Sequence, residues 1–125
     1  MTLPAKLAFV DIETTGTRSM FDRVIEIGII IVENGKITNT YSSLINPKGH
    51  IPPEITLLTG INNEMLEHAP SFNEISREIH GLLSDNIFVA HNVRFDYSFL
   101  KSEFKRSNIS YTSKHFQVGE ADSCG

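Results

Sequence analysis

The chain is poor in cysteine and has no long hydrophobic run. Its one cysteine, Cys124, excludes a disulfide framework and a thiol-based metal site. The longest apolar run, residues 27–32, is far too short to cross a bilayer, and residues 1–6 lack the apolar segment of a signal peptide. We therefore expect a cytoplasmic protein that makes no contact with a membrane.

The chain also lacks an excess of basic residues. Its 125 residues carry a net charge of -4, which argues against a surface coated with cations for non-specific nucleic-acid binding. Residues 94–114 are nevertheless locally positive, with five basic and two acidic side chains. That stretch gives weak support for contact with phosphates and is more typical of a solvated helix face. The length and the 40% apolar content predict one α/β domain.

Apolar and β-branched stretches predict the strands. Residues 7–11 form a nearly uninterrupted apolar run, as expected for a central strand covered on both faces. Residues 24–33 and 36–45 flank Asn34-Gly35, the strongest short hairpin signal, so we expect them to pair antiparallel. Residues 87–90 predict a further buried strand.

Two long helices are predicted after the hairpin. Ser71 and Glu74 form a capping box ahead of apolar residues at helical spacing, which predicts a helix of about four turns. A second helix is expected to begin near Asn92, with its Phe and Leu side chains facing the core. Between the hairpin and these helices, proline and glycine predict a loop-rich connection with a short helix over residues 54–58.

A pair of carboxylates follows the first apolar run. Asp11 and Glu13 lie two residues apart, so a strand places both on the same face. Two adjacent anions repel and need a shared proton, a basic partner or a cation. Because no Lys or Arg lies between Lys6 and Arg18, a divalent metal is favoured, and oxygen ligands favour Mg²⁺ or Mn²⁺ over zinc. From this pair alone, an exposed acidic turn is the other interpretation.

A second polar cluster, residues 91–96 (HNVRFD), directly follows the strand predicted at 87–90. Its side chains therefore lie at the end of a strand that opens into a helix, where open α/β sheets place their sites. Taken singly, Asp96 could serve only the helix dipole and Asn92 only as an N-cap. The joint occurrence of this cluster, Asp-x-Glu and a Thr-Thr-Gly turn favours a functional site.

These motifs resemble those of a known family. Residues 9–16 (FVDIETTG) look like the first motif, and residues 91–96 like the second, of the DEDD (DnaQ-like) 3′-5′ exonucleases, similar to the proofreading epsilon subunit of bacterial DNA polymerase III. The segments VIEIG at 24–28, Asn46-Pro47 and LTGI at 58–61 follow in the expected order. The resemblance implies a ribonuclease H-like fold, a mixed sheet flanked by helices, and assigns residues 1–112 to the exonuclease domain.

The resemblance implies two-metal hydrolysis of the terminal phosphodiester, most simply at the 3′ end of single-stranded DNA, with release of nucleoside monophosphates. Asp11 would bridge two Mg²⁺ or Mn²⁺ ions, and Glu13 and Asp96 would complete their shells. Two such ions generate the attacking hydroxide and stabilise the leaving oxygen. Thr14, Thr15 and Gly16 would offer backbone and hydroxyl donors to the terminal nucleotide. The turn Thr59, Gly60 and Ile61 would shape the pocket, with Ile61 as an apolar surface for the base. His91, Asn92 and Phe95 would support or line the same pocket.

The sequence departs from the family after the second motif. The third motif, His-x-x-x-x-Asp, would supply a fourth carboxylate and the general base, and no match for it occurs. The spacing from His115 to Glu120 imitates it, without apolar helical periodicity. We expect residues 113–125 to form a disordered tail outside the family pattern, as in a truncated or frame-shifted member. Such a domain would be C-terminally incomplete, with weak or absent activity and exposed apolar surface that favours self-association.

Two other functions are compatible with the sequence. A catalytically inactive domain could bind nucleic acid or a DNA polymerase subunit, as the locally basic stretch suggests. Alternatively, the same scaffold could trim RNA ends as an exoribonuclease. The sequence does not separate replication from repair.

Overall fold

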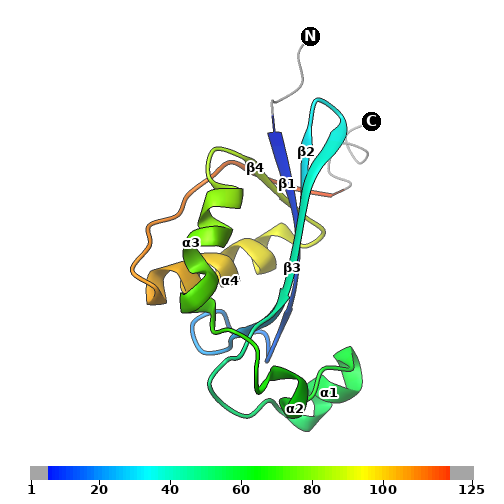
Figure 1. Ribbon diagram of the computed structural model, residues 1–125, viewed down its shortest axis with the longest axis vertical. Coiled ribbons are helices and arrows are strands. Elements are labelled where there is room, and N and C mark those ends of the chain that lie inside the picture. Colours follow the sequence, from blue (N-terminus) through cyan, green and yellow to red (C-terminus); the bar gives the residue numbers. More distant parts are fainter. Residues whose placement is uncertain (1–5, 119–125) are drawn as a thin grey trace.

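The centre of the structure is a mixed five-stranded β-sheet. The computed structural model describes residues 6–118. The strands lie in the order β3-β2-β1-β4-β5; β1, β2 and β3 pair antiparallel, whereas β4 and β5 run parallel to β1 (Figure 1). Their bounds are β1 (Lys6–Thr14), β2 (Val24–Glu33), β3 (Lys36–Leu44), β4 (Ile87–Ala90) and β5 (His115–Gln117).

The hairpin predicted from Asn34-Gly35 is confirmed. Glu33 pairs with Lys36 across the two turn residues. Asn34 and Gly35 have φ angles of 53° and 80°, the left-handed conformation at both positions that a type I′ turn requires. This turn fixes the register of the long β2–β3 ribbon.

One face of the sheet is covered by two helices. Their bounds, with those of two shorter helices, are α1 (Pro53–Thr59), α2 (Asn63–Leu66), α3 (Phe72–Leu83) and α4 (Val93–Arg106). Both α3 and α4 lie on the same side of the sheet (Figure 1). The core side chains Ala8, Val10 and Ile12 of β1 face these helices. The expectation that this strand is covered on both faces is therefore wrong within residues 6–118, because the alternate side chains lie on the open face.

The two long helices form as predicted. The side chain of Ser71 accepts a hydrogen bond from the Glu74 amide, and the Glu74 carboxylate accepts one from the Ser71 amide, which completes the capping box of α3. Phe72 of α3 and Phe104 of α4 pack edge to face with ring centroids 5.2 Å apart, and both are fully buried. Burial of one such side chain contributes roughly 1.5–3 kcal/mol, so these contacts fix α4 against the sheet.

The connection between β3 and α3 has a small core of its own. The short helix predicted here is α1, which ends at Gly60 with φ 80°. Four buried side chains hold this region to the start of β2: Ile25, Ile51, Ile61 and Leu66.

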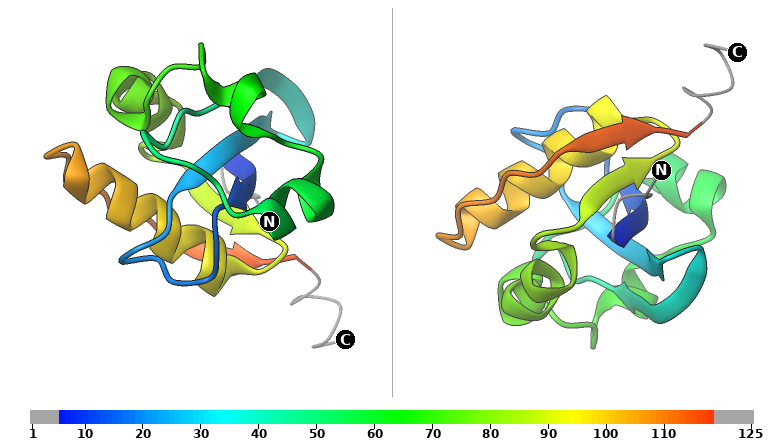
Figure 2. Two further views of the ribbon diagram at one scale, coloured as in Figure 1. Left: turned by 90° about the horizontal axis from the view of Figure 1, so that it is seen from below. Right: turned by 90° about the horizontal axis from the view of Figure 1, so that it is seen from above.

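The segment that follows residue 112 differs from expectation. Residues 113–118 are not a detached tail, because β5 pairs with β4 at the edge of the sheet (Figure 2). The Ser113 amide donates to the Tyr97 hydroxyl at 2.9 Å, and the His115 ring stacks on Tyr97 with centroids 4.4 Å apart. The strand has three residues, too few to show a periodic pattern in the sequence. Its position depends on the edge of β4 and on side chains of α4. The rest of the expected tail, with Glu120, lies outside the described residues.

Several apolar side chains remain exposed on the described part of the chain, among them Ile30, Ile37, Phe116 and Val118. Exposed apolar surface was expected, and self-association through it stays a prediction. None of the helices within residues 6–118 has the length and apolar character needed to cross a bilayer.

Candidate active site

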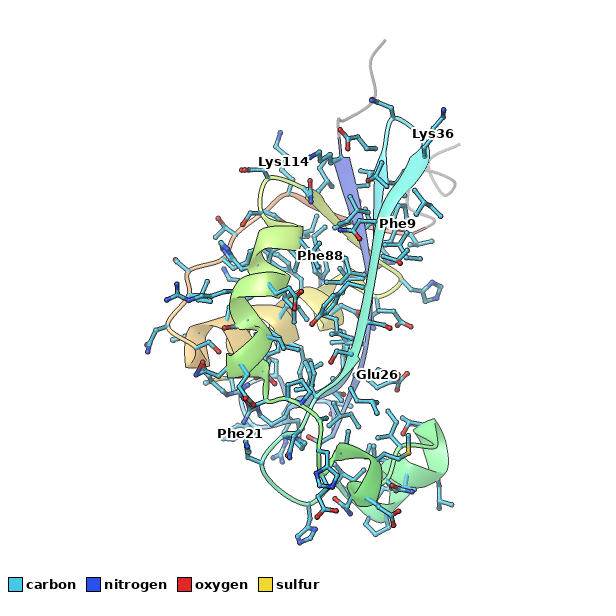
Figure 3. The ribbon with its side chains drawn as sticks, in the orientation of Figure 1. Phe9, Phe21, Glu26, Lys36, Phe88 and Lys114 are labelled. Atoms are coloured by element: carbon cyan, nitrogen blue, oxygen red, sulfur yellow. The ribbon has the colours of Figure 1, made fainter. Side chains whose placement is uncertain are left out.

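The open face of the sheet carries the first two predicted carboxylates. Asp11 is exposed and Glu13 is half-buried, and they alternate with the core side chains of β1. Across the antiparallel pair with β2, Gly28 lies opposite Asp11 and Glu26 lies opposite Glu13. Glu26 points away from α3 and α4 (Figure 3). Three acidic side chains therefore share this part of the open face.

Asp96 joins these acids from the first turn of α4. It is only 7% exposed, and its backbone N–H donates to the Asn92 carbonyl at 3.0 Å. Burial, followed by the nearby charge of Asp11 and then that of Glu13, raises the pKa of Asp96 to about 7. Burial and the charges of Asp11 and Glu26 also raise the pKa of Glu13. Asp11 and Glu13 thus lie near enough to Asp96 to influence its pKa, and the role of the three acids as metal ligands stays a prediction.

The chemistry of these side chains fits a divalent cation. They offer only carboxylate oxygens, the ligands that Mg²⁺ and Mn²⁺ prefer. A cation would offset both the burial and the mutual repulsion that raise the pKa values of Glu13 and Asp96. Among residues 6–118, however, no three His, Cys, Asp or Glu side chains already stand close enough to form a complete ligand set. The acids are therefore electrostatically coupled without being preassembled around an ion.

Two hollows meet at Asp11. The larger, of about 880 Å³, is mainly apolar and includes Phe9, Ile30 and His91 in its lining. The smaller, of about 230 Å³, is lined by Glu13, Glu26 and Ser42 among others. Asp11 and Gly28 line both hollows. A Cβ at Gly28 would meet nothing closer than the Asp11 carbonyl oxygen at 4.0 Å, so glycine leaves free space beside the Asp11 carboxylate.

The Thr-Thr-Gly turn uses its polar groups internally. The Thr14 hydroxyl is buried and donates to the Gly16 carbonyl at 2.6 Å. The Thr15 amide donates to the Arg23 carbonyl, and the Thr15 hydroxyl accepts from the Arg23 amide, both at 2.9 Å. A Cβ at Gly16 would lie 2.5 Å from the Asp22 carboxylate, so this glycine admits Asp22. The expectation that both hydroxyls are free donors for a nucleotide is therefore wrong, because they stabilise the turn.

The predicted base-binding turn at residues 59–61 is built differently from expectation. The Thr59 hydroxyl donates to the Ile55 carbonyl at 2.8 Å and accepts from the Ile61 amide at 3.1 Å. Ile61 is 3% exposed and packs in the small core, so it cannot present an apolar surface to a base. Thr59, Gly60 and Ile61 line neither hollow beside Asp11. The exposed apolar side chains of this region are Leu57 and Leu58 of α1, which the sequence prediction did not single out.

The three remaining predicted residues surround the start of α4. His91 is exposed and lines the larger hollow together with Asp11. Asn92 occupies the N-cap position and is exposed, and its side chain makes no capping hydrogen bond. Phe95 is half-buried and packs on Phe99 with ring centroids 4.7 Å apart, a core role. His91 and Asn92 are thus available to a ligand, whereas Phe95 supports the helix.

Two features of the site were missed by sequence reasoning. The first is Glu26, whose place beside Glu13 depends on the register between β1 and β2. The second is the ion pair between Arg23 and Glu103, which are 80 residues apart in the sequence. The signal that could have found Glu26 is its place as the one charged residue within the apolar run of β2, between Ile25 and Ile27.

The fold and the acidic site define a class of protein. A mixed sheet with carboxylates on β1 and at the start of α4 is a ribonuclease H-like domain with a candidate metal site. Exonuclease I in its apo form superposes with a TM-score of 0.83 at 18% identity, covering 96% of this chain and 30% of that chain. A zinc-bound form of an Escherichia coli exonuclease I complex with single-stranded DNA gives a TM-score of 0.82 at 19% identity, covering 94% and 29%. At such low identity, these likenesses show the fold alone.

Sequence comparison defines the family. The model of the exonuclease family RNase_T matches residues 8–122, so the chain belongs to this exonuclease family. The match extends past residue 112, in agreement with the pairing of β5. A 3′-5′ exonuclease DinG of Staphylococcus aureus strain USA300 is 49% identical over 110 residues, which are 88% of this chain and 12% of the relative. The chain therefore spans about an eighth of the length of this curated relative.

The raised pKa of Asp96 predicts a pH-dependent gain of stability in Asp96→Asn. The native state holds the Asp96 proton up to about pH 7, whereas the unfolded chain releases it near the ordinary value of 3.8. Stability therefore falls as pH rises between these values, and asparagine removes that fall. In EDTA at pH 8, we expect the variant to be more stable than the wild type by about 1 to 4 kcal/mol.

The measurement is urea unfolding of both proteins from pH 4 to pH 8. The difference should shrink to about 0.5 kcal/mol at pH 4, where the native wild type is protonated and the unfolded chain is partly protonated. A variant that is less stable than the wild type at pH 8 would show that Asp96 is not held under electrostatic strain.

A second prediction concerns the free space beside Asp11. Gly28→Val should stabilise the strand by about 0.5 to 1 kcal/mol, because valine is a better strand former than glycine. It should also weaken the binding of Mn²⁺ measured by calorimetry, since the new side chain fills the space next to the carboxylate. Asn39→Val, at an exposed position of β3 outside both hollows, is the matched control for the gain of strand propensity. Unchanged Mn²⁺ binding in Gly28→Val would mean that this space is not needed.

Proposed function

We propose that this chain is the catalytic domain of a 3′-5′ exonuclease that hydrolyses the terminal phosphodiester of single-stranded DNA. The observation that carries the proposal is the coupling of Asp11, Glu13 and Asp96 across β1 and α4, in a member of an exonuclease family. The S. aureus relative is named a 3′-5′ exonuclease, which supports this direction. The single-stranded DNA in the E. coli exonuclease I complex supports this class of substrate.

The cofactor proposed for the site is a pair of Mg²⁺ or Mn²⁺ ions held by Asp11, Glu13 and Asp96. When bound, such ions supply positive charge to the reacting phosphate and lower the pKa of a bound water. Asp96 gives up the proton that its raised pKa retains near neutral pH, so that all three acids are available as anions. Glu26, opposite Glu13, adds a further negative charge beside the three acids, which favours the binding of cations at this site.

The residues around the acids hold and orient the strand end. Exposed His91 and Asn92 lie at the start of the helix that carries Asp96 and are the proposed contacts for the terminal nucleotide. The turn of Thr14, Thr15 and Gly16 contributes through its backbone shape, since its hydroxyls are engaged within the loop. The segment Thr59 to Ile61 ends α1, whose exposed Leu57 and Leu58 side chains are the proposed apolar contacts for the nucleic-acid strand.

A proofreading or repair role and a DNA polymerase subunit as a partner stay predictions from the resemblance. The cytoplasmic location stays a prediction from the composition of the sequence. The low activity of this chain by itself is a further prediction, because no third motif with its general base occurs within residues 6–118. The preference for DNA over RNA is part of the test below.

The proposal predicts that release of mononucleotides depends on Asp11. A 3′-labelled single strand incubated with the protein and Mg²⁺ or Mn²⁺ should lose its label as a nucleoside monophosphate, slowly for this chain. Asp11→Ala should reduce the rate by at least about 100-fold, because an essential carboxylate of the site is removed. Glu33→Ala, which removes a carboxylate from the far end of the same sheet, is the matched control and should keep the wild-type rate.

The outcomes of this assay separate the remaining functions. Release that survives in Asp11→Ala contradicts the proposal. Salt-dependent DNA binding that EDTA does not change, without any release, identifies a nucleic-acid-binding module instead. Faster release from an RNA strand than from DNA of the same sequence identifies an exoribonuclease.

A further inference from the structure

A buried carboxylate lies on the same helix as Asp96, two turns further along. Glu103 is 1% exposed, so its charge is almost wholly removed from water. Its oxygens accept hydrogen bonds from the Arg23 side chain, at 2.9 Å from Nη2 and 3.0 Å from Nε, and from the Val24 amide at 2.9 Å. Buried ion pairs of this kind often give little net stability, because desolvation offsets the attraction. Net stability therefore does not by itself account for this ion pair.

What the pair holds is the loop between β1 and β2, residues 15–23. Arg23 ends this loop, and its backbone exchanges two hydrogen bonds of 2.9 Å with Thr15 at the other end. Within the loop, the Asp22 carboxylate accepts from the Arg18 amide at 2.9 Å and from the Thr15 hydroxyl at 3.4 Å. Thr15 is two residues after Glu13. Glu103 is thus connected through Arg23 to the end of the strand that carries the catalytic acids.

A second connection joins the same loop to α4. Arg106 Nη2 donates to the carbonyl oxygens of Ser19 at 3.2 Å and Met20 at 3.1 Å. Arg106 Nη1 also lies 3.4 Å from the Glu103 carboxylate. The end of α4 therefore holds the loop at two places. Glu103 binds Arg23 where the loop closes, and Arg106 binds the carbonyl groups at the tip of the loop.

We propose that Glu103, Arg23 and Arg106 form a positioning clamp that sets the β1–β2 loop, and with it the turn of Thr14 to Gly16, against the end of α4. The inference rests on the proposed function, because what the clamp positions is the site for the strand end. These residues touch neither the acids nor the hollows beside Asp11. They act through the loop, and loosening them displaces the turn of Thr14 to Gly16 relative to α4.

The test compares Glu103→Gln and Arg106→Lys with the wild type. Glutamine can still accept from the Val24 amide but loses the charge that holds Arg23. Lysine keeps the charge of Arg106 but has one nitrogen, so it cannot bind the loop carbonyls and the Glu103 carboxylate from two separate nitrogens, as Nη2 and Nη1 of Arg106 do. Arg77→Lys, at an exposed position of α3, is the matched control. The readouts are amide hydrogen exchange of residues 15–23, KM and kcat for release from a single strand, and Mn²⁺ affinity.

The clamp predicts local loosening with an effect on substrate binding. In Glu103→Gln, exchange at the Thr15 and Asp22 amides should become about tenfold faster, and KM should rise about fivefold to tenfold. Mn²⁺ affinity should stay within about twofold of the wild type, because the acids themselves are intact. Arg106→Lys should change exchange and KM in the same direction by less, and Arg77→Lys should change neither. Since Glu103→Gln removes a negative charge, general electrostatics alone would lower KM for DNA.

The opposing result is a folded Glu103→Gln or Arg106→Lys protein with wild-type loop exchange and wild-type KM. That result would make the ion pair purely structural and overturn the inference. If Glu103→Gln does not fold, Arg106→Lys decides alone. Absence of metal-dependent release by the wild type contradicts the proposed function, and the positioning role falls with it. Faster loop exchange with unchanged KM rejects the inference while leaving the proposed function intact.

Discussion

Repulsion among carboxylates is the constraint on which this structure depends. Asp11 and Glu13 share a face of β1, and α4 adds Asp96 to the same region. Burial, followed by the mutual charge, raises the pKa values of Glu13 and Asp96, so the folded chain retains a cost that it would not carry with neutral side chains. Such a concentration of acids favours the binding of a cation, and Asp11, Glu13 and Asp96 are the ligands proposed for it. The ribonuclease H-like scaffold supplies that arrangement by joining one antiparallel strand pair to one helix start.

The helix α4 connects the chemistry to the rest of the domain. Its first turn places Asp96, its middle buries Phe99 and Leu100, and its last turns hold the β1–β2 loop through Glu103 and Arg106. The aromatic cluster beside it also anchors the segment that leads into β5, through the hydrogen bond between Tyr97 and Ser113. One element therefore determines how the strand acids, the helix acid and the sheet edge lie relative to one another. The open face of the sheet, by contrast, leaves apolar side chains such as Ile30 accessible around the site.

Local rules were sufficient for much of the fold and for the acids, but not for the contacts that join distant segments. The Asn34-Gly35 hairpin, the Ser71 capping box and the alternation of Asp11 with Glu13 each follow from a few neighbouring residues. β5 could not be predicted, because three residues form a strand only when the edge of β4 is present. The burial of Ile61 depends on Ile25 and Leu66, and the pairing of Arg23 with Glu103 joins residues 80 positions apart. Such non-local contacts leave no periodic pattern in the sequence, so reading a motif residue as a ligand contact failed for Ile61 and for the threonine hydroxyls.

The most direct test of the central claim is calorimetric titration with Mn²⁺ in two buffers that differ in ionisation enthalpy. At pH 7 the Asp96 carboxyl is about half protonated, so binding of the cation to the three acids should release roughly half a proton. At pH 8.5 the release should almost vanish, and Asp11→Ala should abolish tight binding at both pH values. Absence of Mn²⁺ binding by the wild type, or binding without proton release at pH 7, would contradict the claim that the coupled carboxylates form a cation site.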